Sequence, residues 1–254
     1  MKFSIVTVAY NAANTIGDAL ASIVGQKNAE IESIVIDGGS RDKTMEIVSS
    51  FGARIARVVS EPDRGIYDAM NKGLALATGD VVAFLNADDY YADDTTLAFV
   101  AQTLASTGAT LAAGAVEQVN PAGRVVRTIR ATAYRPGKYR WGYFPPHPGL
   151  FVTTAIARGT GGFDPGFRIG GDFEFFIRMS RRADFRLTTV DRTLVKMRTG
   201  GVSTSGMGVY LDISRDMKRA LVKNGFKTGH WRIDLRGLRK FPELFSWPRR
   251  PPCA

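Results

Sequence analysis

The first 86 residues alternate between short apolar runs and segments with helical spacing, and this alternation restricts the fold more than any other feature. The apolar runs have the length and composition of buried strands. They are "FSIVTVAY" (3–10), "ESIVIDGGS" (32–40), "ARIARVVSE" (53–61) and "DVVAFLN" (80–86). Helical spacing occupies 16–24, 41–51 and 65–79 between them. The pattern predicts an α/β fold with a mixed, mostly parallel sheet flanked by helices.

The pattern changes from about residue 110. "TLAAGAVEQV" and "GRVVRTIRA" flank "NPAG", which predicts a hairpin. No internal repeat or low-complexity linker separates the two halves, so we expect one domain over 1–207, with 111–207 built over the sheet edge. A helix is predicted over 209–223, at the start of a basic, helical C-terminal extension, 208–254.

Composition excludes several classes of protein. The 254 residues are 44% apolar, enough for a sizeable core. Cys253 is the single cysteine and there are two histidines, so neither a disulfide framework nor a Cys/His zinc site is expected, which suits the cytosol. The apolar runs are too short to span a bilayer. Asn11 interrupts the N-terminal run too early for a secretory signal, and we interpret this run as a first strand.

Polar side chains follow three of the predicted strands: Tyr10, Asp37, and Asn86 with Asp88 and Asp89. Open α/β sheets bind ligands beyond the carboxyl ends of their strands, so these groups should share one rim. Adjacent carboxylates repel, and each raises the pKa of the other unless a positive charge lies between them. The acidic pair is therefore either well solvated on a loop or shares a cation.

Two common ways of binding a diphosphate are absent. The turn after the first strand reads "AYNAANTIGD", without the Gly-x-Gly-x-x-Gly that lets backbone approach a dinucleotide. No Walker-type Gly-Lys-Ser/Thr loop is present either. If a diphosphate binds, a divalent cation held by Asp88 and Asp89 would neutralise it.

Four segments in order, "SIVTVAYNA", "VIDGGSRDKT", "SEPDRGIYDAMNKGLALATGD" and "FLNADD", resemble the family 2 glycosyltransferases, which have the GT-A fold, in particular the bacterial group that builds surface polysaccharides. The resemblance is close over 1–100 and looser over 140–205. It implies a nucleotide-sugar-binding half, 1–110, and an acceptor half, 111–207. The implied nucleotide contacts are Val8, Tyr10, Asp37, Arg64, Asn86 and Asp88.

The resemblance also implies a divalent metal, Mn²⁺ or Mg²⁺, held by Asp88 and Asp89. The chain departs from the family pattern twice. The usual pair of acids after the second strand is here Asp37-Gly38, and the first acid of the DXD-like motif is Asn86.

The resemblance also implies a base in "GGDFEFFIRM", in which Asp172 matches the carboxylate that serves as base in the family. In an inverting transfer it would take the proton of the acceptor hydroxyl, and a helix N-terminus would favour its ionised form. Its alternative role is that of a helix cap. Glu174 is a second candidate, about 200° further around the helix. His147, in "PPHPG", is a candidate for contacting a phosphate or the acceptor, or is simply packed.

Most of the net charge of +10 lies in residues 215–250, which hold eleven Lys or Arg and three acids. Aromatic and leucine side chains alternate with these charges, a combination that suits an anionic membrane surface better than nucleic acid. We therefore expect a cytoplasmic enzyme at the inner face of a bacterial plasma membrane. It would move a sugar from a nucleotide donor, favoured as a UDP-sugar, to a glycan or lipid-linked acceptor. The alternatives are an inactive GT-A-like binding module and a nucleotidyltransferase.

Overall fold

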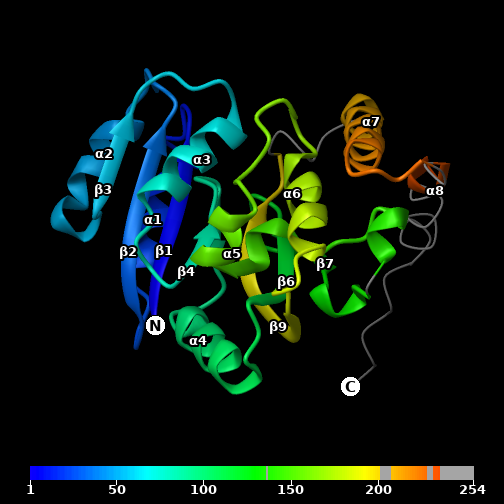
Figure 1. Cartoon of the computed structure of the whole chain (residues 1–254). Helices are drawn as coiled ribbons and strands as arrows, with labels where there is room; N and C mark the ends of the chain where they lie inside the picture. Colours follow the sequence, from blue (N-terminus) through cyan, green and yellow to red (C-terminus); the bar gives the residue numbers. More distant parts are fainter. Residues whose placement is uncertain (136, 201–206, 228–230, 235–254) are drawn as a thin grey trace, which may run out of the picture.

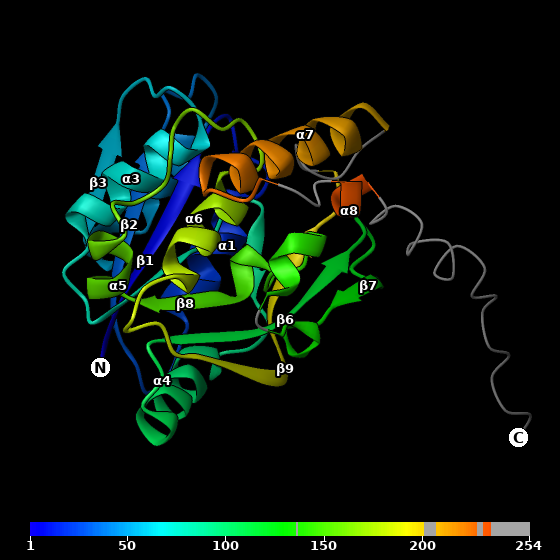
Figure 2. The same cartoon turned by 45° about the vertical axis from the view of Figure 1, so that its right-hand side comes forward.

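The computed structural model describes residues 1–135, 137–200, 207–227 and 231–234 (Figures 1 and 2). The predicted alternation of strand and helix is present in the N-terminal part. Its elements are β1 (Lys2–Ala9), α1 (Ile16–Val24), β2 (Glu30–Asp37), α2 (Thr44–Ser50), β3 (Arg57–Ser60), α3 (Ile66–Leu76) and β4 (Val81–Phe84). The remaining elements are β5 (Asp89–Tyr91), α4 (Thr96–Thr107), β6 (Leu111–Val119), β7 (Val125–Ile129), β8 (Leu150–Thr153), α5 (Thr154–Gly159), α6 (Gly171–Ser180), β9 (Leu187–Arg198), α7 (Met207–Lys223) and α8 (Trp231–Asp234).

The strands form a mixed sheet in the order β3-β2-β1-β4-β8-β6-β9-β5, with β7 paired to β6. The four strands at the N-terminal side are parallel, and the longest pairing of the other half, β6 with β9, is parallel too. Ala9 pairs with Asp37 and Asp37 with Ser60, so the carboxyl ends of β1, β2 and β3 lie side by side. The predicted α/β class, the mostly parallel sheet and the β6–β7 hairpin are confirmed.

The third strand is shorter than the predicted 53–61. Gly52–Arg54 forms a 3-10 turn, and Ile55 behind it is 8% exposed, which anchors the turn on the core. Only Arg57–Ser60 pairs with β2, as an edge strand with largely exposed side chains. Arg54 interrupts the apolar pattern and lies in this turn, so the strand starts at Arg57 instead of at residue 53.

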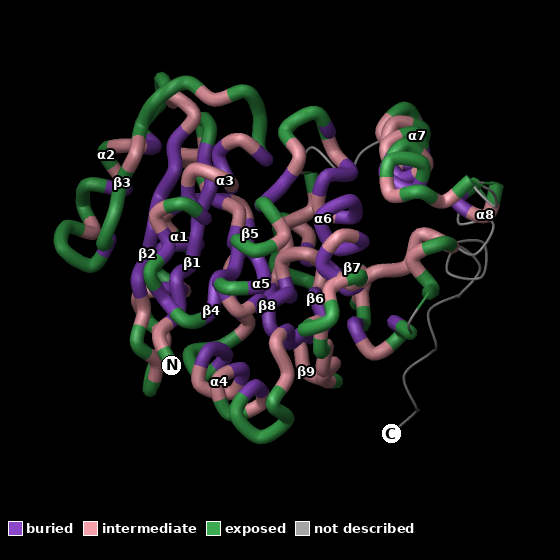
Figure 3. The backbone as a smooth tube through the Cα atoms, in the orientation of Figure 1, coloured by how far each residue is buried: buried purple, intermediate pink, exposed green. Residues whose placement is uncertain are grey.

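Helices cover both faces of the sheet, and strand side chains alternate between the two layers. Phe3 and Ile5 of β1 pack in one core with α1, α2 and α4. Val6 and Val8 pack in the other with α3, α5, α6 and α7. Figure 3 shows the buried strands running between these layers. At Gly73 helix α3 approaches β1 so closely that an added Cβ would collide with the side chain of Val6.

Helix α7 belongs to the second core layer. The predicted face of 209–223 is confirmed, since Met217 and Leu221 are each 1% exposed. Asp216 accepts the backbone N–H groups of Ile169 (3.1 Å) and Gly170 (3.3 Å) just before α6. Residues 228–230 and 235–254 of the predicted basic extension lie outside the described residues, and the boundary at 207/208 stays a prediction. Within the described ranges, no helix combines the length and the apolar character that crossing a bilayer requires.

Candidate active site

The acidic pair after β4 is drawn into the sheet instead of lying on an open loop. Leu85 and Ala87 still donate backbone hydrogen bonds to Val6 and Val8 of β1. The chain then turns and enters β5, where Asp89 pairs with Met197 of β9. Asp89 is 0% exposed and Asp88 is half-buried. A freely solvated turn is thereby ruled out for Asp89.

Burial raises the pKa of Asp89 well above its ordinary value, and the charge of Asp88 raises it further. Burial also raises the pKa of Asp88, while Arg198 opposes the shift. Asn86 Nδ2 lies 3.4 Å from Asp89 Oδ2. Asn86 Oδ1 and Asp89 Oδ1 are buried and have no hydrogen-bond partner within the described part of the chain. Unpaired buried oxygens are costly, and these two need either a donor or a cation.

These residues fit a hard divalent cation, which prefers carboxylate and amide oxygens. No group of three or more acids, histidines or cysteines gathers in a metal-binding arrangement within the described ranges. A cation held by Asp88 and Asp89, with the amide oxygen of Asn86 nearby, would therefore complete its ligands with water and substrate oxygens. That is the usual arrangement for Mg²⁺ on a nucleotide.

Arg198 was not singled out from the sequence. At the end of β9 its guanidinium donates to the Asp18 carboxylate and to the backbone oxygen of Asp88, 3.2 Å away. It also stacks over the ring of Tyr90, 4.9 Å from the centroid. A fixed positive charge therefore lies beside the acidic pair, although 110 residues separate Arg198 from Asp88.

The ends of β1 and β2 bring together three of the predicted nucleotide contacts. Val8 is 8% exposed and Tyr10 is 65% exposed. Asp37 is fully buried, and its Oδ2 accepts from Gly39 N (3.1 Å), Ser40 N (3.0 Å) and Ser60 Oγ (2.6 Å). These hydrogen bonds shape the loop after β2. The role of Asp37 toward a nucleoside stays a prediction.

Arg64, the fourth predicted contact, lies on the surface just before α3. Its guanidinium pairs with Asp68 Oδ1 at 3.0 Å, and 80% of its side chain is exposed. Such an exposed pair contributes little to stability because water screens it, so Arg64 is readily redirected toward a ligand.

Asp172 lies in the first turn of α6, where the helix dipole favours a negative charge. The helix is capped at Gly170, so Asp172 is not the N-cap residue, although its Oδ1 accepts the N–H of Phe173 at 2.8 Å. Desolvation by the surrounding protein raises the pKa of Asp172 to about 6. Hydrogen bonds from Phe173 N–H and from the Tyr67 hydroxyl act in the opposite direction.

Tyr67, from "GIYDAMNKG", is a site residue that the sequence did not reveal. Its side chain reaches from α3 to the start of α6, where its hydroxyl donates to the backbone oxygen of Ile169. A Cβ on Gly171 would lie 2.6 Å from the Tyr67 ring, so only glycine permits this contact. Burial, and then the charge of Asp172, raise the pKa of Tyr67 well above its ordinary value. Tyr67 therefore stays protonated, and its single O–H proton is shared between the Ile169 oxygen and the Asp172 carboxylate.

The side chains of the two secondary candidates, Glu174 and His147, contact other residues inside the protein. Glu174 is fully buried, and it pairs with Arg178 through two guanidinium nitrogens, at 2.9 and 2.7 Å. His147 stacks on Phe84 with ring centroids 5.6 Å apart. Burial lowers the pKa of His147 to about 4, so it is neutral at pH 7 and brings no charge to a phosphate. Packing accounts for both residues, and their roles toward an acceptor stay predictions.

The sequence model described as "Glycosyl transferase family 2" matches residues 4–177. The chain belongs to this family. The match takes in the acidic pair, Asp37, Arg64 and Asp172, and the predicted resemblance is confirmed. Glycosyl transfer is thus the activity of the family to which this site belongs.

Two relatives of this family 2 glycosyltransferase are found in mycobacteria. An uncharacterised glycosyltransferase of Mycobacterium tuberculosis is 29% identical over 236 residues, covering 89% of this chain and 88% of its own length. A PGL/p-HBAD biosynthesis glycosyltransferase of Mycobacterium bovis is 39% identical over 102 residues, covering 39% of this chain and 40% of that protein.

Solved structures confirm the GT-A type of fold. Staphylococcus aureus TarS 1–349, crystallised with UDP-GlcNAc, superposes with a TM-score of 0.70 at 19% identity, covering 95% of this chain and 73% of that one. The mannosyltransferase PcManGT of Pyrobaculum calidifontis, in complex with GDP-Man and Mn²⁺, gives 0.65 at 18% identity, covering 97% and 76%.

Proposed function

We propose that this family 2 glycosyltransferase moves a sugar, with inversion, from a UDP-sugar to a glycan or lipid-linked acceptor in bacterial cell-surface polysaccharide or glycolipid synthesis. The observation that carries the proposal is Asp172: a carboxylate in the first turn of a helix, with a pKa of about 6. Such a group is mostly ionised at pH 7, yet basic enough to accept a proton from a hydroxyl as that hydroxyl attacks.

The chemistry assigned to the chain's own residues follows from this position. Asp172 takes the proton of the acceptor hydroxyl while the hydroxyl oxygen forms a bond to the anomeric carbon. The bond between that carbon and the diphosphate oxygen breaks on the opposite face, and the nucleoside diphosphate leaves with the electron pair. Tyr67 and the N–H of Phe173 hold Asp172 in place and favour its ionised form.

Asp88 and Asp89, with Asn86, would hold the divalent cation, Mn²⁺ or Mg²⁺. When bound, the metal supplies positive charge for the departing diphosphate. The unpartnered buried oxygens of Asn86 and Asp89 support this assignment. The nucleotide sugars bound in the TarS and PcManGT complexes support a nucleotide-sugar donor, and UDP is the nucleotide we favour.

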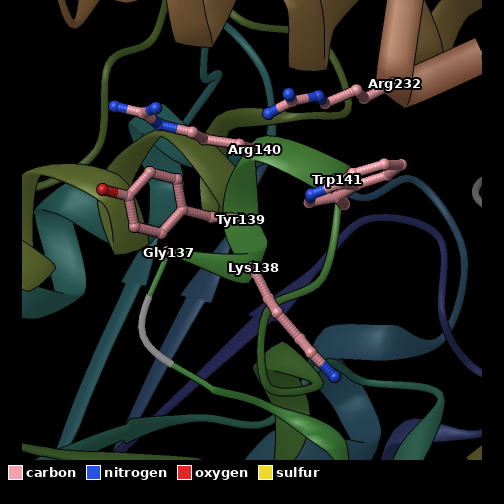
Figure 4. A pocket seen from close by; sticks show the side chains of 6 residues that line it. All are labelled: Gly137, Lys138, Tyr139, Arg140, Trp141 and Arg232. Atoms are coloured by element: carbon pink, nitrogen blue, oxygen red, sulfur yellow. The ribbon is translucent and has the colours of Figure 1, made fainter. Parts of the chain in front are cut away.

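A cavity of about 390 Å³ supports the proposal that the protein binds an anionic acceptor or an anionic membrane surface (Figure 4). It is lined by Gly137, Lys138, Tyr139, Arg140, Trp141 and Arg232. The Arg232 guanidinium lies 4.9 Å from the Trp141 ring and 5.6 Å from that of Trp231. Cations beside aromatic rings suit the phosphate and apolar chain of a lipid. The proposed location is accordingly the cytoplasmic face of the membrane, with this surface turned toward it and the net positive charge of segment 215–250 adding to the attraction for anionic lipid.

A thermal-shift titration with UDP and UDP-sugars, with and without Mn²⁺, tests the proposal. A ligand that binds only the folded state raises the unfolding midpoint. We expect a rise that requires metal and is lost in Asp88→Asn/Asp89→Asn. The matched control is Asp93→Asn/Asp94→Asn, a second adjacent pair, engaged by Arg192 and Lys27, that should keep the response.

Turnover separates an enzyme from an inactive binding module. Asp172→Asn should bind donor and metal like the wild type but lose donor hydrolysis and transfer. A metal-independent response of unchanged size would refute the metal site, and wild-type turnover in Asp172→Asn would refute the base.

A further inference from the structure

Gly38 lies directly after β2, and the side chain of another residue occupies the space that a side chain at position 38 would fill. A Cβ built on Gly38 would lie 2.5 Å from Oδ2 of Asp63 and 3.4 Å from Cδ2 of Tyr10. The first distance is far inside van der Waals contact. Position 38 therefore cannot carry a side chain while Asp63 stays where it is, and the Asp63 carboxylate occupies the position that such a side chain would fill.

The segment after β3 brings Asp63 to this place. Glu61 donates its backbone N–H to Asp37 O at 3.0 Å, which extends the pairing of β3 with β2 by one residue. Pro62 then lies beside Gly39, whose φ of +84° is a conformation that favours glycine. The loop after β2 and the loop after β3 are thus fitted to each other through two glycines.

The two carboxylate oxygens of Asp63 have different surroundings. Oδ1 accepts the backbone N–H of Gly65 at 2.9 Å, which fixes the plane of the group. Oδ2 has no hydrogen-bond partner among residues 1–135, 137–200, 207–227 and 231–234. The residue is half-buried, so Oδ2 is held in place and still open to a ligand.

Tyr10 lies beside this oxygen, and its ring is 65% exposed. An exposed ring and a fixed hydrogen-bond acceptor lie together at the carboxyl ends of parallel strands, where ligands of such sheets bind. A planar heterocycle with an N–H on its edge matches both features, because its face stacks on an aromatic ring while its edge donates to the carboxylate.

We propose that Asp63 reads the base of the nucleotide donor, with Oδ2 accepting the imide N3–H of uracil stacked on Tyr10, in place of a side chain at position 38. The inference rests on the proposed function, since it names the residue that selects the nucleotide. Cytosine has a lone pair at N3 and would face the carboxylate with repulsion. Guanine offers two adjacent N–H groups that pair best with both oxygens of a carboxylate, and Gly65 already occupies Oδ1.

The variant Asp63→Asn should reverse which base position 63 favours. The N–H of Gly65 requires an oxygen at the Oδ1 position, so the amide nitrogen of the asparagine must take the place of Oδ2. A donor then faces the base where an acceptor was. Uracil N3–H meets another N–H, whereas cytosine N3 meets a partner.

Isothermal titration with UDP and CDP, in the presence of Mn²⁺, measures this change. The wild type should prefer UDP. Asp63→Asn should bind UDP about 10- to 100-fold more weakly, the loss expected for a hydrogen bond to a charged group, and should bind CDP more tightly than the wild type does. Glu61→Gln is the matched control, because it removes an equal charge two residues away and should keep the preference for UDP.

Two further variants distinguish loss of the contact to the base from a general loss of folding. Asp63→Ala should lose UDP affinity without gaining CDP affinity. Gly38→Ala should weaken UDP binding while Asp63 itself is retained, because the new methyl group displaces the carboxylate. An unchanged UDP-to-CDP ratio in Asp63→Asn would overturn the assignment of Asp63 and leave the proposed function intact. A wild type that binds no nucleoside diphosphate would overturn both.

Discussion

Removal of the Tyr67 hydroxyl should shift the pH dependence of turnover. In the structure this hydroxyl lowers the pKa of Asp172, opposing the desolvation that raises that pKa to about 6. A hydrogen bond to an ionised group contributes about 1.5–3 kcal/mol, and one pKa unit corresponds to about 1.4 kcal/mol. Because the hydroxyl proton is shared with the Ile169 oxygen and Asp172 is only partly buried, we take the lower end of this range. Tyr67→Phe should therefore raise the pKa of Asp172 by about one unit, to about 7.

The direction follows from the role of a base, which acts in its ionised form. Turnover in the wild type should rise with pH, reach half its plateau near pH 6 and stay level above it. In Tyr67→Phe this rise, the acid limb of the pH profile, should have its midpoint near pH 7. Relative to the wild type, kcat then falls about fivefold at pH 6 and hardly at all at pH 8.5. The assay is kcat for donor hydrolysis or transfer between pH 5 and 9, at saturating donor and metal.

Tyr134→Phe is the matched control. It removes a hydroxyl from the same core layer without touching Asp172, so its limb should stay near pH 6. Loss of the bond from Tyr67 to Ile169 should lower the free energy of unfolding by only about 1 kcal/mol, which keeps the variant folded. A limb that stays near pH 6 in Tyr67→Phe would refute the coupling between Tyr67 and Asp172.

Two further predictions concern stability. Gly73→Ala should lower the free energy of unfolding by about 1–3 kcal/mol, because the new methyl collides with Val6; urea denaturation should show the loss, and Val6→Ala should recover part of it. Glu174→Gln should lower the free energy of unfolding by about 3 kcal/mol, because the Arg178 guanidinium loses its charged partner, while kcat per folded molecule stays unchanged. A fall in kcat without a loss of stability would contradict this structural role.

The predictions that succeeded rest on local patterns. The apolar runs at 3–10 and 80–86 became β1 and β4, because a run of that composition and length is stable only as a buried strand in such a sheet. The face of 209–223 became the buried face of α7 for the same reason. The strand at 53–61 was predicted too long, since its first residues, up to Arg54, belong to an exposed 3-10 turn.

The parts of the site that escaped prediction depend on distant partners. The burial of Asp89 follows from the pairing of β5 with β9, more than a hundred residues along the chain. Tyr67 reaches Ile169 across a similar separation, and Asp63 fills the space of Gly38 from another loop. No spacing within a single segment indicates these contacts.

Three features follow from local patterns in the chain: the alternation of strands and helices, the rim on which polar groups gather, and the residues that resemble the family's site. They depend on periodicity and on residue type at strand ends. The packing of the folded chain sets which carboxylates are buried, which are already paired and which oxygen is left open to a ligand. Burial and pairing are set by the elements that pack together from distant parts of the chain, and these set the charge state of a group and its freedom to bind.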